Sequence, residues 1–369
     1  MIDQRIEKYA ELLVNYCVAV KPHDKVIIHG NILAEPLLSA LYKYVLKVGA
    51  YPLLDVSLPN KDELLFKNAS EKQISYIHET EKHIVENYDV DIFIESSQNT
   101  KNLTNINPSK IALHAKARKS IRKTFMHRVA KEEMRWVYAI FPTNALAQDA
   151  AMSLSDYEDF VYNACLPDLN NPIAYWQELQ VRQQKIVDWF VGKKKIHVIA
   201  EDTDLKMSID GRTFSNCDGR ENMPDGEVFT GPIENSVEGH IKFSFPGIYK
   251  GNEVEGVQLW FEQGKVVKAT ADKNETFLNE MINSDEGAQY VGEFAIATNE
   301  NITKFTKSIL FDEKIGGTIH IALGAGYPET GSKNESGIHW DMICDTRNQS
   351  EIWVDDELIF KNGEFVIGF

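Results

Sequence analysis

The stretch "HIALGAGYPETGSKNESGIHWDMICD", residues 320–345, gathers two histidines, a tyrosine and an aspartate among several glycines. In its last part a single residue, Trp340, separates His339 from Asp341. On an extended strand residues i and i+2 point to the same face, so these two side chains would lie side by side with the indole opposite. An imidazole next to a carboxylate is typical of a pair of metal ligands.

Further acids and a second histidine stand in short motifs upstream. Glu227 lies in "NMPDGEVFTGP", Glu293 in "VGEFAI", and Glu313, His320 and Tyr327 in "FDEKIGGTIHIALGAGY". A glycine precedes both Glu227 and Glu293, as expected where the backbone must come close to a shared centre. Taken singly, His320 is typical of a packing residue and each glutamate of a surface acid. Their grouping favours a shared functional site over separate structural roles.

The donor atoms of this group indicate the kind of metal. They are carboxylate oxygens and imidazole nitrogens, with Cys344 the only cysteine nearby. Such donors suit zinc, cobalt, manganese or magnesium in a catalytic role better than a cysteine-rich structural zinc site. Several carboxylates with two histidines exceed the needs of one ion and suit two ions about 3.5 to 4 Å apart that share a bridging carboxylate. We therefore expect two divalent metal ions per chain.

The first half of the chain must supply a scaffold of strands and helices. Short apolar runs alternate with longer helical patterns, and the runs are residues 25–30, 51–58, 90–96 and 136–142. This alternation predicts an α/β domain with a parallel sheet covered by helices on both faces. The turn after the first run, "HGNILAEP", has one glycine and lacks a phosphate-binding motif. His29 at that turn could line a cleft, although a histidine there is more often a packing residue.

The second half has a different pattern. A helical segment over 171–192 is followed by β-rich runs with expected turns at Asp210-Gly211, Gln263-Gly264 and Asn362-Gly363. One further helix is expected at 273–284. We therefore predict an α/β domain over 1–192 and a mainly antiparallel β (α+β) domain over 193–369 that carries the metal site.

Composition excludes several classes of partner. A formal charge of -16 in 369 residues would repel nucleic acid and anionic membrane surfaces. No run of about 18 uncharged apolar residues is present, so no membrane span is expected. The four cysteines lie far apart without a CxxC pair, and the N-terminus has a helical stripe rather than a signal peptide. We expect a cytoplasmic protein with reduced cysteines.

The motifs "MPDGEVFTGP", "VGEFA", "GGTIHIALGAGYPETG" and "HWDM", in this order, resemble the thermophilic metalloaminopeptidases of the aminopeptidase T type, which are leucyl-type enzymes with a metal pair. The N-terminal "YAELLVNYCVAVKPHDKVIIHG" is also similar, so the likeness covers nearly the whole chain. It implies a homodimer with an enclosed active site, and Tyr327 as a side chain that stabilises the developing oxyanion. The metal ligands it implies are Glu227, Glu293, His320, His339 and Asp341.

Two assignments go beyond this set. We choose Glu293 as the bridging carboxylate and, with Tyr327, as a catalytic residue. Glu313 is a further ligand or an acid that supports one, and Gly316 and Gly317 lengthen the stretch between it and His320.

Together these features predict a metal-dependent aminopeptidase that removes single residues from the N-terminus of short peptides. One alternative is a two-metal hydrolase of another amide or ester, since a metal pair sets the reaction class better than the substrate. Another is a non-catalytic scaffold in which the metals hold the β-domain together. A small-molecule-binding module in the α/β half is disfavoured by the missing glycine-rich turn.

Overall fold

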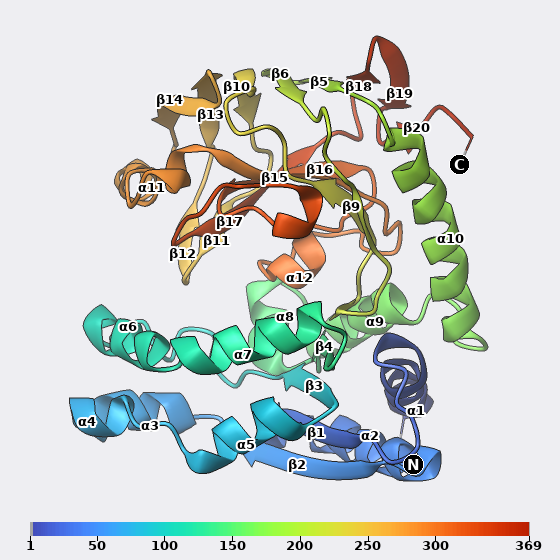
Figure 1. The fold of residues 1–369 in the computed structure, drawn as a ribbon, viewed down its shortest axis with the longest axis vertical. Helices are drawn as coiled ribbons and strands as arrows, with labels where there is room; N and C mark the ends of the chain where they lie inside the picture. The colour runs from blue at the N-terminus through green and yellow to red at the C-terminus, as the bar shows by residue number, and fades with distance from the viewer. Residues whose placement is uncertain (1–2, 369) are drawn as a thin grey trace. The chain divides into compact units, whose positions relative to one another are not determined.

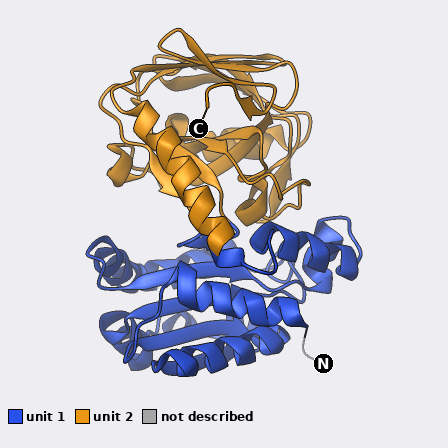
Figure 2. Cartoon of the chain, turned by 90° about the vertical axis from the view of Figure 1, so that its right-hand side faces the viewer, with its two compact units in different colours: residues 1–173, 219–224 blue, residues 174–218, 225–369 orange. Residues whose placement is uncertain are grey.

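The structure is a computed structural model that describes residues 3–368 (Figure 1). The chain divides into two compact units (Figure 2). Unit 1 comprises the residues up to Ile173 together with Gly219–Pro224, and unit 2 comprises Ala174–Asp218 and Asp225–Phe369. Among the described residues, no helix is both long and apolar enough to cross a membrane.

Unit 1 is built on a five-stranded sheet in the order β2-β1-β3-β4-β8. All of its strand pairs are parallel. The strands are β1 (Lys25–Asn31), β2 (Tyr51–Ser57), β3 (Val90–Glu95), β4 (Arg135–Ile140) and β8 (Asn222–Met223). The first four match the apolar runs in the sequence. Of these, β1, β3 and β4 lie inside the sheet, where a parallel strand is covered on both faces, whereas β2 is an edge strand and mostly exposed. The predicted parallel sheet with helices in this half of the chain is confirmed.

One α-helix precedes β1, and the others fill the connections between these strands. They are α1 (Gln4–Leu12), α2 (Glu35–Val48), α3 (Lys61–Asn68), α4 (Glu71–Ile74), α5 (Glu79–Asn87), α6 (Pro108–Ala117), α7 (Lys119–Ala130), α8 (Asn144–Asp149) and α9 (Leu154–Cys165). The helix α2 has a proline in its first turn and ends at Gly49, whose φ of 85° is left-handed. Proline at the start and glycine at the end are the usual boundary signals of a helix.

Unit 2 combines the helix α10 (Pro172–Phe190) with antiparallel sheets. The larger sheet contains β14 (Lys265–Thr270), β13 (Gln258–Glu262), β10 (Glu238–Lys242), β6 (Thr203–Ser208), β5 (Lys195–Ala200), β18 (Glu351–Val354), β19 (Glu357–Lys361) and β20 (Glu364–Phe365), in this order. The second sheet contains β17 (His339–Asp345), β16 (Thr318–Gly324), β15 (Val291–Ala297), β9 (Glu227–Thr230) and β7 (Ser215–Cys217). The remaining elements are a two-stranded ribbon of β11 (Gly247–Tyr249) and β12 (Asn252–Val254), and the helices α11 (Glu275–Ile282) and α12 (Ile309–Asp312).

One apolar core joins the two larger sheets of unit 2. Val198 and Leu259 of the eight-stranded sheet belong to the same buried cluster as Phe294 and Ile321 of the five-stranded sheet. The five-stranded sheet of unit 2 therefore packs with one face against the eight-stranded sheet. The mainly antiparallel second half predicted from the sequence is confirmed.

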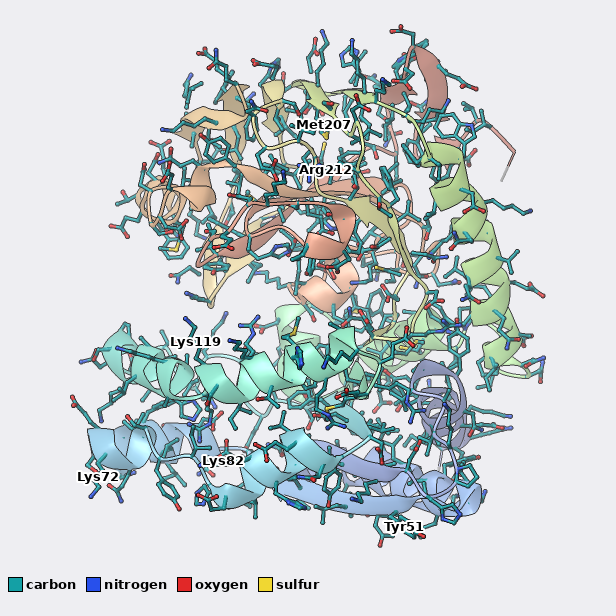
Figure 3. The ribbon with its side chains drawn as sticks, in the orientation of Figure 1. Tyr51, Lys72, Lys82, Lys119, Met207 and Arg212 are labelled. Carbon is teal, nitrogen blue, oxygen red and sulfur yellow. The ribbon has the colours of Figure 1, made fainter. Side chains whose placement is uncertain are left out.

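The predicted turns have different outcomes. Gln263-Gly264 joins the paired strands β13 and β14, and Asn362-Gly363 joins β19 and β20, so both hairpins are confirmed. The turn expected at Asp210-Gly211 is also present, but it does not close a hairpin, because β6 pairs with β5 and β10 whereas β7 pairs with β9. Here the turn carries the chain from one sheet to the other. Arg212, labelled in Figure 3, anchors it by donating to a carboxylate oxygen of Glu234 at 2.7 Å.

The division of the chain near α10 also differs from the boundary expected at residues 192 and 193. The two compact units divide at the first residues of α10, so the helix packs with unit 2. The assignment of functional domains to 1–192 and 193–369 stays a prediction.

Candidate metal centre

The candidate ligands all lie in unit 2, and most stand on neighbouring strands of the five-stranded sheet. Glu227 begins β9, Glu293 is on β15, His320 is on β16, and His339 and Asp341 are on β17. Because these four strands are adjacent, residues far apart in the sequence come together on one face. Glu227, Glu293 and His320 are buried, with exposures of 5%, 4% and 1%.

Small residues make room for these side chains. In the strand register Glu293 pairs with Ala322, and Ala322 pairs with Asp341. Glu227 pairs with Ala297 in the same way. Alanine at these buried positions leaves the volume between the strands to the carboxylates.

Glu293 lies between the two imidazoles. Its Oε1 is 3.4 Å from Nε2 of His320 and its Oε2 is 3.3 Å from Nε2 of His339. Asp341 Oδ1 is 3.3 Å from the same atom of His339. The two oxygens of one carboxylate therefore face two different nitrogen donors.

Backbone carbonyls fix both rings. Nδ1 of His320 donates to the carbonyl oxygen of Glu313 at 3.0 Å, and Nδ1 of His339 donates to that of Ala325 at 2.7 Å. In a neutral ring this leaves the lone pair on Nε2, which faces the carboxylates. Two acceptors can face each other only with a cation or a proton between them, so the donor set fits a divalent ion.

The carboxylates around His320 and His339 control the protonation of both imidazole rings. Burial lowers the pKa of each histidine, but the neighbouring carboxylates raise it to about 10 for His320 and about 12 for His339. The carboxylates that raise the pKa of His320 are those of Glu227, Glu293 and Asp341. Positive charge is thus strongly favoured at this place.

Glu227 has a buried oxygen without a hydrogen-bond partner. This atom, Oε2, is 3.6 Å from Nε2 of His320, and burial raises the pKa of the carboxyl to about 8. An orphan buried acceptor is costly, and a bound cation would satisfy it.

Glu313 reaches the cluster although it stands seven residues before His320. It follows α12, and its carboxylate lies within 4.8 Å of ligand atoms of His320 and Asp341. Gly316 donates to Asn299 O at 3.0 Å, and Gly317 has a φ of 81°. The two glycines fold the extra residues into a turn, so the longer spacing leaves Glu313 beside the other acids.

Tyr327 follows β16 at the edge of the cluster. Its ring centre is 5.2 Å from that of His339 and 5.1 Å from that of Phe229, and the side chain is 38% exposed. Desolvation and the carboxylates of Glu293 and Asp341 raise the pKa of the hydroxyl. The tyrosine therefore stands next to the candidate ligands as a hydrogen-bond donor.

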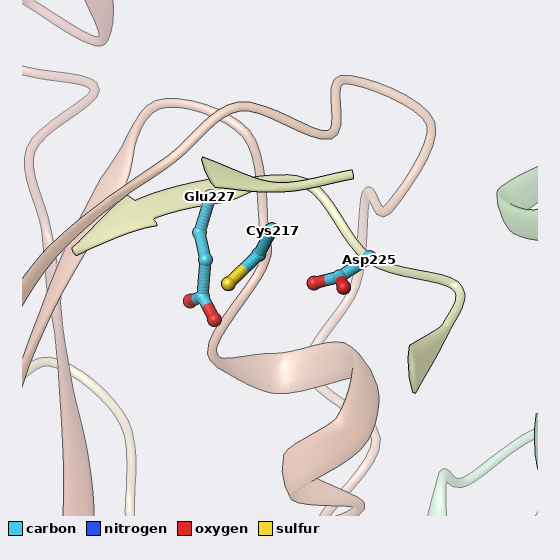
Figure 4. A group of neighbouring side chains, drawn as sticks. All are labelled: Cys217, Asp225 and Glu227. Atoms are coloured by element: carbon cyan, nitrogen blue, oxygen red, sulfur yellow. The ribbon is translucent and has the colours of Figure 1, made fainter. Parts of the chain in front are cut away.

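Sequence reasoning missed three residues beside this site: Lys314, Asp225 and Cys217. Lys314 Nζ is 3.8 Å from Glu227 Oε1 and 3.9 Å from Asp225 Oδ1, and it contacts Glu313 Oε1. Figure 4 shows Cys217, Asp225 and Glu227 directed toward a common space. The available signal was a lysine inside the apolar context of "ILFDEKIGGTIHIALG", where a charged side chain needs partners.

Four potential metal-binding groups emerge among the described residues, each with ligand atoms within 4.8 Å of one another. They are Glu227-Glu293-His320, Glu293-His339-Asp341, Glu313-His320-Asp341 and Cys217-Asp225-Glu227. All six ligands named from the sequence occur in the first three. The geometry defines a carboxylate- and histidine-rich centre on a β-sheet, as in metal-dependent hydrolases.

A family model for thermophilic metalloproteases (M29) matches residues 2–365, so the chain belongs to this family. It is 26% identical to Aminopeptidase 2 of Geobacillus stearothermophilus, over 99% of this chain and 92% of that protein. It is 27% identical to Aminopeptidase T of Thermus thermophilus, over 66% of this chain and 64% of that protein. These matches confirm the resemblance found in the sequence and the prediction of a metal-dependent aminopeptidase.

Solved structures confirm the fold. Wild-type AmpT of Thermus thermophilus is similar over 100% of both chains, with a TM-score of 0.88 and 21% identity. A 2,5-dihydroxypyridine dioxygenase of Pseudomonas putida is similar over 100% of this chain and 98% of its own, with a TM-score of 0.57 and 12% identity.

Proposed function

We propose that this enzyme removes the N-terminal residue of short peptides at a centre of two divalent metal ions. The observation that supports two ions is Glu293, whose two oxygens face two different imidazoles. The proposed ligands are Glu227, Glu293, Glu313, His320, His339 and Asp341.

The donor groups divide into two sets that share Glu293. One set adds Glu227 and His320, and the other adds His339 and Asp341. Oxygen and nitrogen donors of this kind accept zinc and cobalt, and also manganese or magnesium. Glu313 is the further ligand or supporting acid, because it lies beside a member of each set.

When bound, such an ion pair polarises the scissile carbonyl and lowers the pKa of a water molecule. The chain provides the other functions. Tyr327 donates its hydroxyl hydrogen to the oxyanion that develops on the substrate carbonyl. Glu293, which the two sets of donor groups share, sets the distance between these two sets. Glu313 is the most exposed of the three glutamates, with 16% of its side chain accessible against 7% for Glu227 and 5% for Glu293, so we assign proton transfer to the leaving amine to Glu313.

The carboxylates of the site also support exopeptidase specificity. The α-amino group of a peptide is a cation at neutral pH, and the cluster offers several acids within a small volume. Because an internal peptide bond brings no such charge, the acids favour substrates with a free N-terminus.

Metal analysis combined with a peptidase assay tests this function. The purified enzyme should contain two divalent ions per chain and hydrolyse leucine p-nitroanilide and short peptides. Chelation should abolish hydrolysis, and zinc or cobalt should restore it. Full activity in a verified metal-free sample would refute the proposal, whereas hydrolysis of esters or other amides with none on peptides would favour the alternative hydrolase.

We further infer that the protein is a homodimer of the cytoplasm. The edge strand β2 supports the dimer, because Tyr51, Leu53, Leu54 and Val56 expose 40% to 58% of their surfaces along it (Tyr51 is labelled in Figure 3). The four free cysteines agree with a reducing compartment. Light scattering on the eluting protein would give the oligomeric state.

A further inference from the structure

A second group of potential cation ligands, which we call the pocket, adjoins the proposed metal centre. Its walls are Cys217 at the end of β7, Asp225 before β9, and Glu227 at the start of β9, all visible in Figure 4. Their ligand atoms lie within 4.8 Å of one another, and Asp225 and Glu227 are 2% and 5% exposed. The Oε2 atom of Glu227 lacks a hydrogen-bond partner. By donor type alone, this group would bind a thiophilic divalent ion.

Lys314 places its ammonium group at this pocket. Nζ is 3.9 Å from Asp225 Oδ1 and 3.8 Å from Glu227 Oε1, and it also contacts a carboxylate oxygen of Glu313. The lysine is completely buried, with 0% exposure. A fully buried ammonium enclosed by three carboxylates is a structural counter-ion rather than a solvated surface charge.

The backbone around the pocket is held firmly. Gly226, between the two acids, has a φ of 123°, and a Cβ there would lie 2.7 Å from Cβ of Asn299. The amide of Asn299 donates to the carbonyl oxygen of Asp225 at 2.8 Å. On the other side, Lys314 N donates to Phe311 O at 3.0 Å, which closes the turn after α12. The lysine and its acids are therefore positioned by close packing.

We propose that Lys314 is the resident cation of the pocket formed by Cys217, Asp225 and Glu227. In this role it keeps a further divalent ion out of the pocket and holds Glu227 on the metal centre. The inference deepens the proposed function, because Glu227 is also a proposed ligand there. Two divalent ions and one lysine carry five positive charges, which balance the carboxylates of Asp225, Glu227, Glu293, Glu313 and Asp341.

Metal substitution in the wild-type protein gives the first test. The chelated enzyme is reloaded with cadmium or cobalt, and thiolate-to-metal charge-transfer absorption is recorded in the ultraviolet. With Lys314 in the pocket, Cys217 should bind no metal, so the wild-type spectrum should match that of Cys217→Ser. A thiolate band that disappears in Cys217→Ser would overturn the proposal.

Removal of the lysine gives the second test. The variant Lys314→Met should bind one ion per chain more than wild type and show the thiolate band, and Lys314→Met with Cys217→Ser should lose the band. Lys333→Met, at an exposed position, is the control and should behave as wild type. A folded Lys314→Met protein with the wild-type metal count and no thiolate band would refute the role.

A third variant covers the case in which Lys314→Met does not fold. Lys314→Met with Asp225→Asn removes one charge of each sign, so it should fold and retain the wild-type metal count. If it also fails to fold while Asp225→Asn alone folds, the lysine is needed for packing and the counter-ion role is wrong. These readouts compare metal counts with wild type, so they hold whether or not the enzyme cleaves peptides or binds two ions.

Discussion

At the scale of single residues, Glu293 is the side chain on which the proposed two-ion arrangement depends. It lies next to an irregularity in the pairing of β15 with β16, between Val291 and Glu293. Such a bulge changes the direction of a side chain and is frequent beside active sites. The consequence is that each of its oxygens faces a different imidazole.

We predict that Glu293→Gln loses or weakens at least one metal ion. A neutral amide removes a negative charge from a site that must offset two divalent cations. Metal content by plasma emission spectroscopy is the measurement, with circular dichroism to verify folding. Glu300→Gln is the control, because 78% of that side chain is exposed and its only ion pair is a long one of 3.5 Å to Arg182 within the described residues. Two ions and normal turnover in Glu293→Gln would require withdrawal of the bridging role.

We predict that Tyr327→Phe lowers kcat by roughly 10² to 10³, the usual effect of losing one oxyanion donor. Its ring contacts with His339 and Phe229 survive in phenylalanine, so metal content should not change. Steady-state kinetics on leucine p-nitroanilide would measure the effect. Wild-type kcat would assign the tyrosine to packing.

At the scale of elements, the register of four strands brings the candidate ligands together. Local periodicity was sufficient to predict that His339 and Asp341 share a face, because strand alternation is a property of neighbouring residues. The approach of Glu227 to His320 depends on how β9, β15 and β16 pair, which no local pattern contains. The family resemblance supplied those candidate ligands, whereas the meeting of Lys314 with Asp225 and Cys217 was missed because only the fold brings these separate segments together. For the same reason the sequence predicted a turn at Asp210-Gly211 but not that the strands on its two sides belong to different sheets.

We predict that Gly292→Ala destabilises the protein by about 1–3 kcal/mol, the usual range for inserting atoms into a packed interior. A Cβ at this position would lie 2.4 Å from the carbonyl oxygens of Gly324 and Ala325. Because Glu293 is the next residue, metal affinity should also fall. Urea denaturation and metal titration would measure both effects. Gly368→Ala, where a Cβ would have no neighbour within 4 Å, should change neither.

The end of β17 gives a pH-dependent prediction. The guanidinium of Arg347 donates to Asp345 at 2.6 Å, and this hydrogen bond lowers the pKa of the Asp345 carboxyl. An acid with a depressed folded-state pKa stabilises the protein above its unfolded pKa of about 3.9, and the stabilisation is lost as pH falls through the folded value.

Arg347→Met should therefore reduce stability at neutral pH by up to about 1 kcal/mol, because the pair is partly exposed. The difference from wild type should vanish below the folded pKa of Asp345. Unfolding free energies measured from pH 7 down to pH 2 would show this convergence. A difference that stays constant over the whole range would exclude the ion pair as its source.

At the scale of the whole molecule, the two compact units are not consecutive in the chain. The chain passes between them after Ile173, after Asp218 and after Pro224. The short return segment contains β8, which pairs with β4 and completes the parallel sheet. It also supplies Met223 O, which accepts a hydrogen bond at 3.1 Å from the buried hydroxyl of Tyr9.

We predict that a fragment of residues 1–173 is less stable than the same fragment extended by a flexible linker and residues 219–224. The shorter fragment leaves an unpaired edge at β4 and deprives Tyr9 of its acceptor, an effect of about 1–3 kcal/mol for a buried polar group. Urea denaturation of both fragments would compare them. Equal midpoints would show that β8 is dispensable for unit 1.

This connectivity restricts how the gene can be rearranged. A single crossover at the end of unit 1 would transfer the parallel sheet without Gly219–Pro224, which lie within the coding sequence of unit 2. Functional exchange of unit 1 between relatives therefore requires either two separate exchanges or relatives whose β8 segments are interchangeable. Recombination libraries of this family should accordingly recover active chimaeras in which residues 219–224 come from the same parent as the first 173 residues.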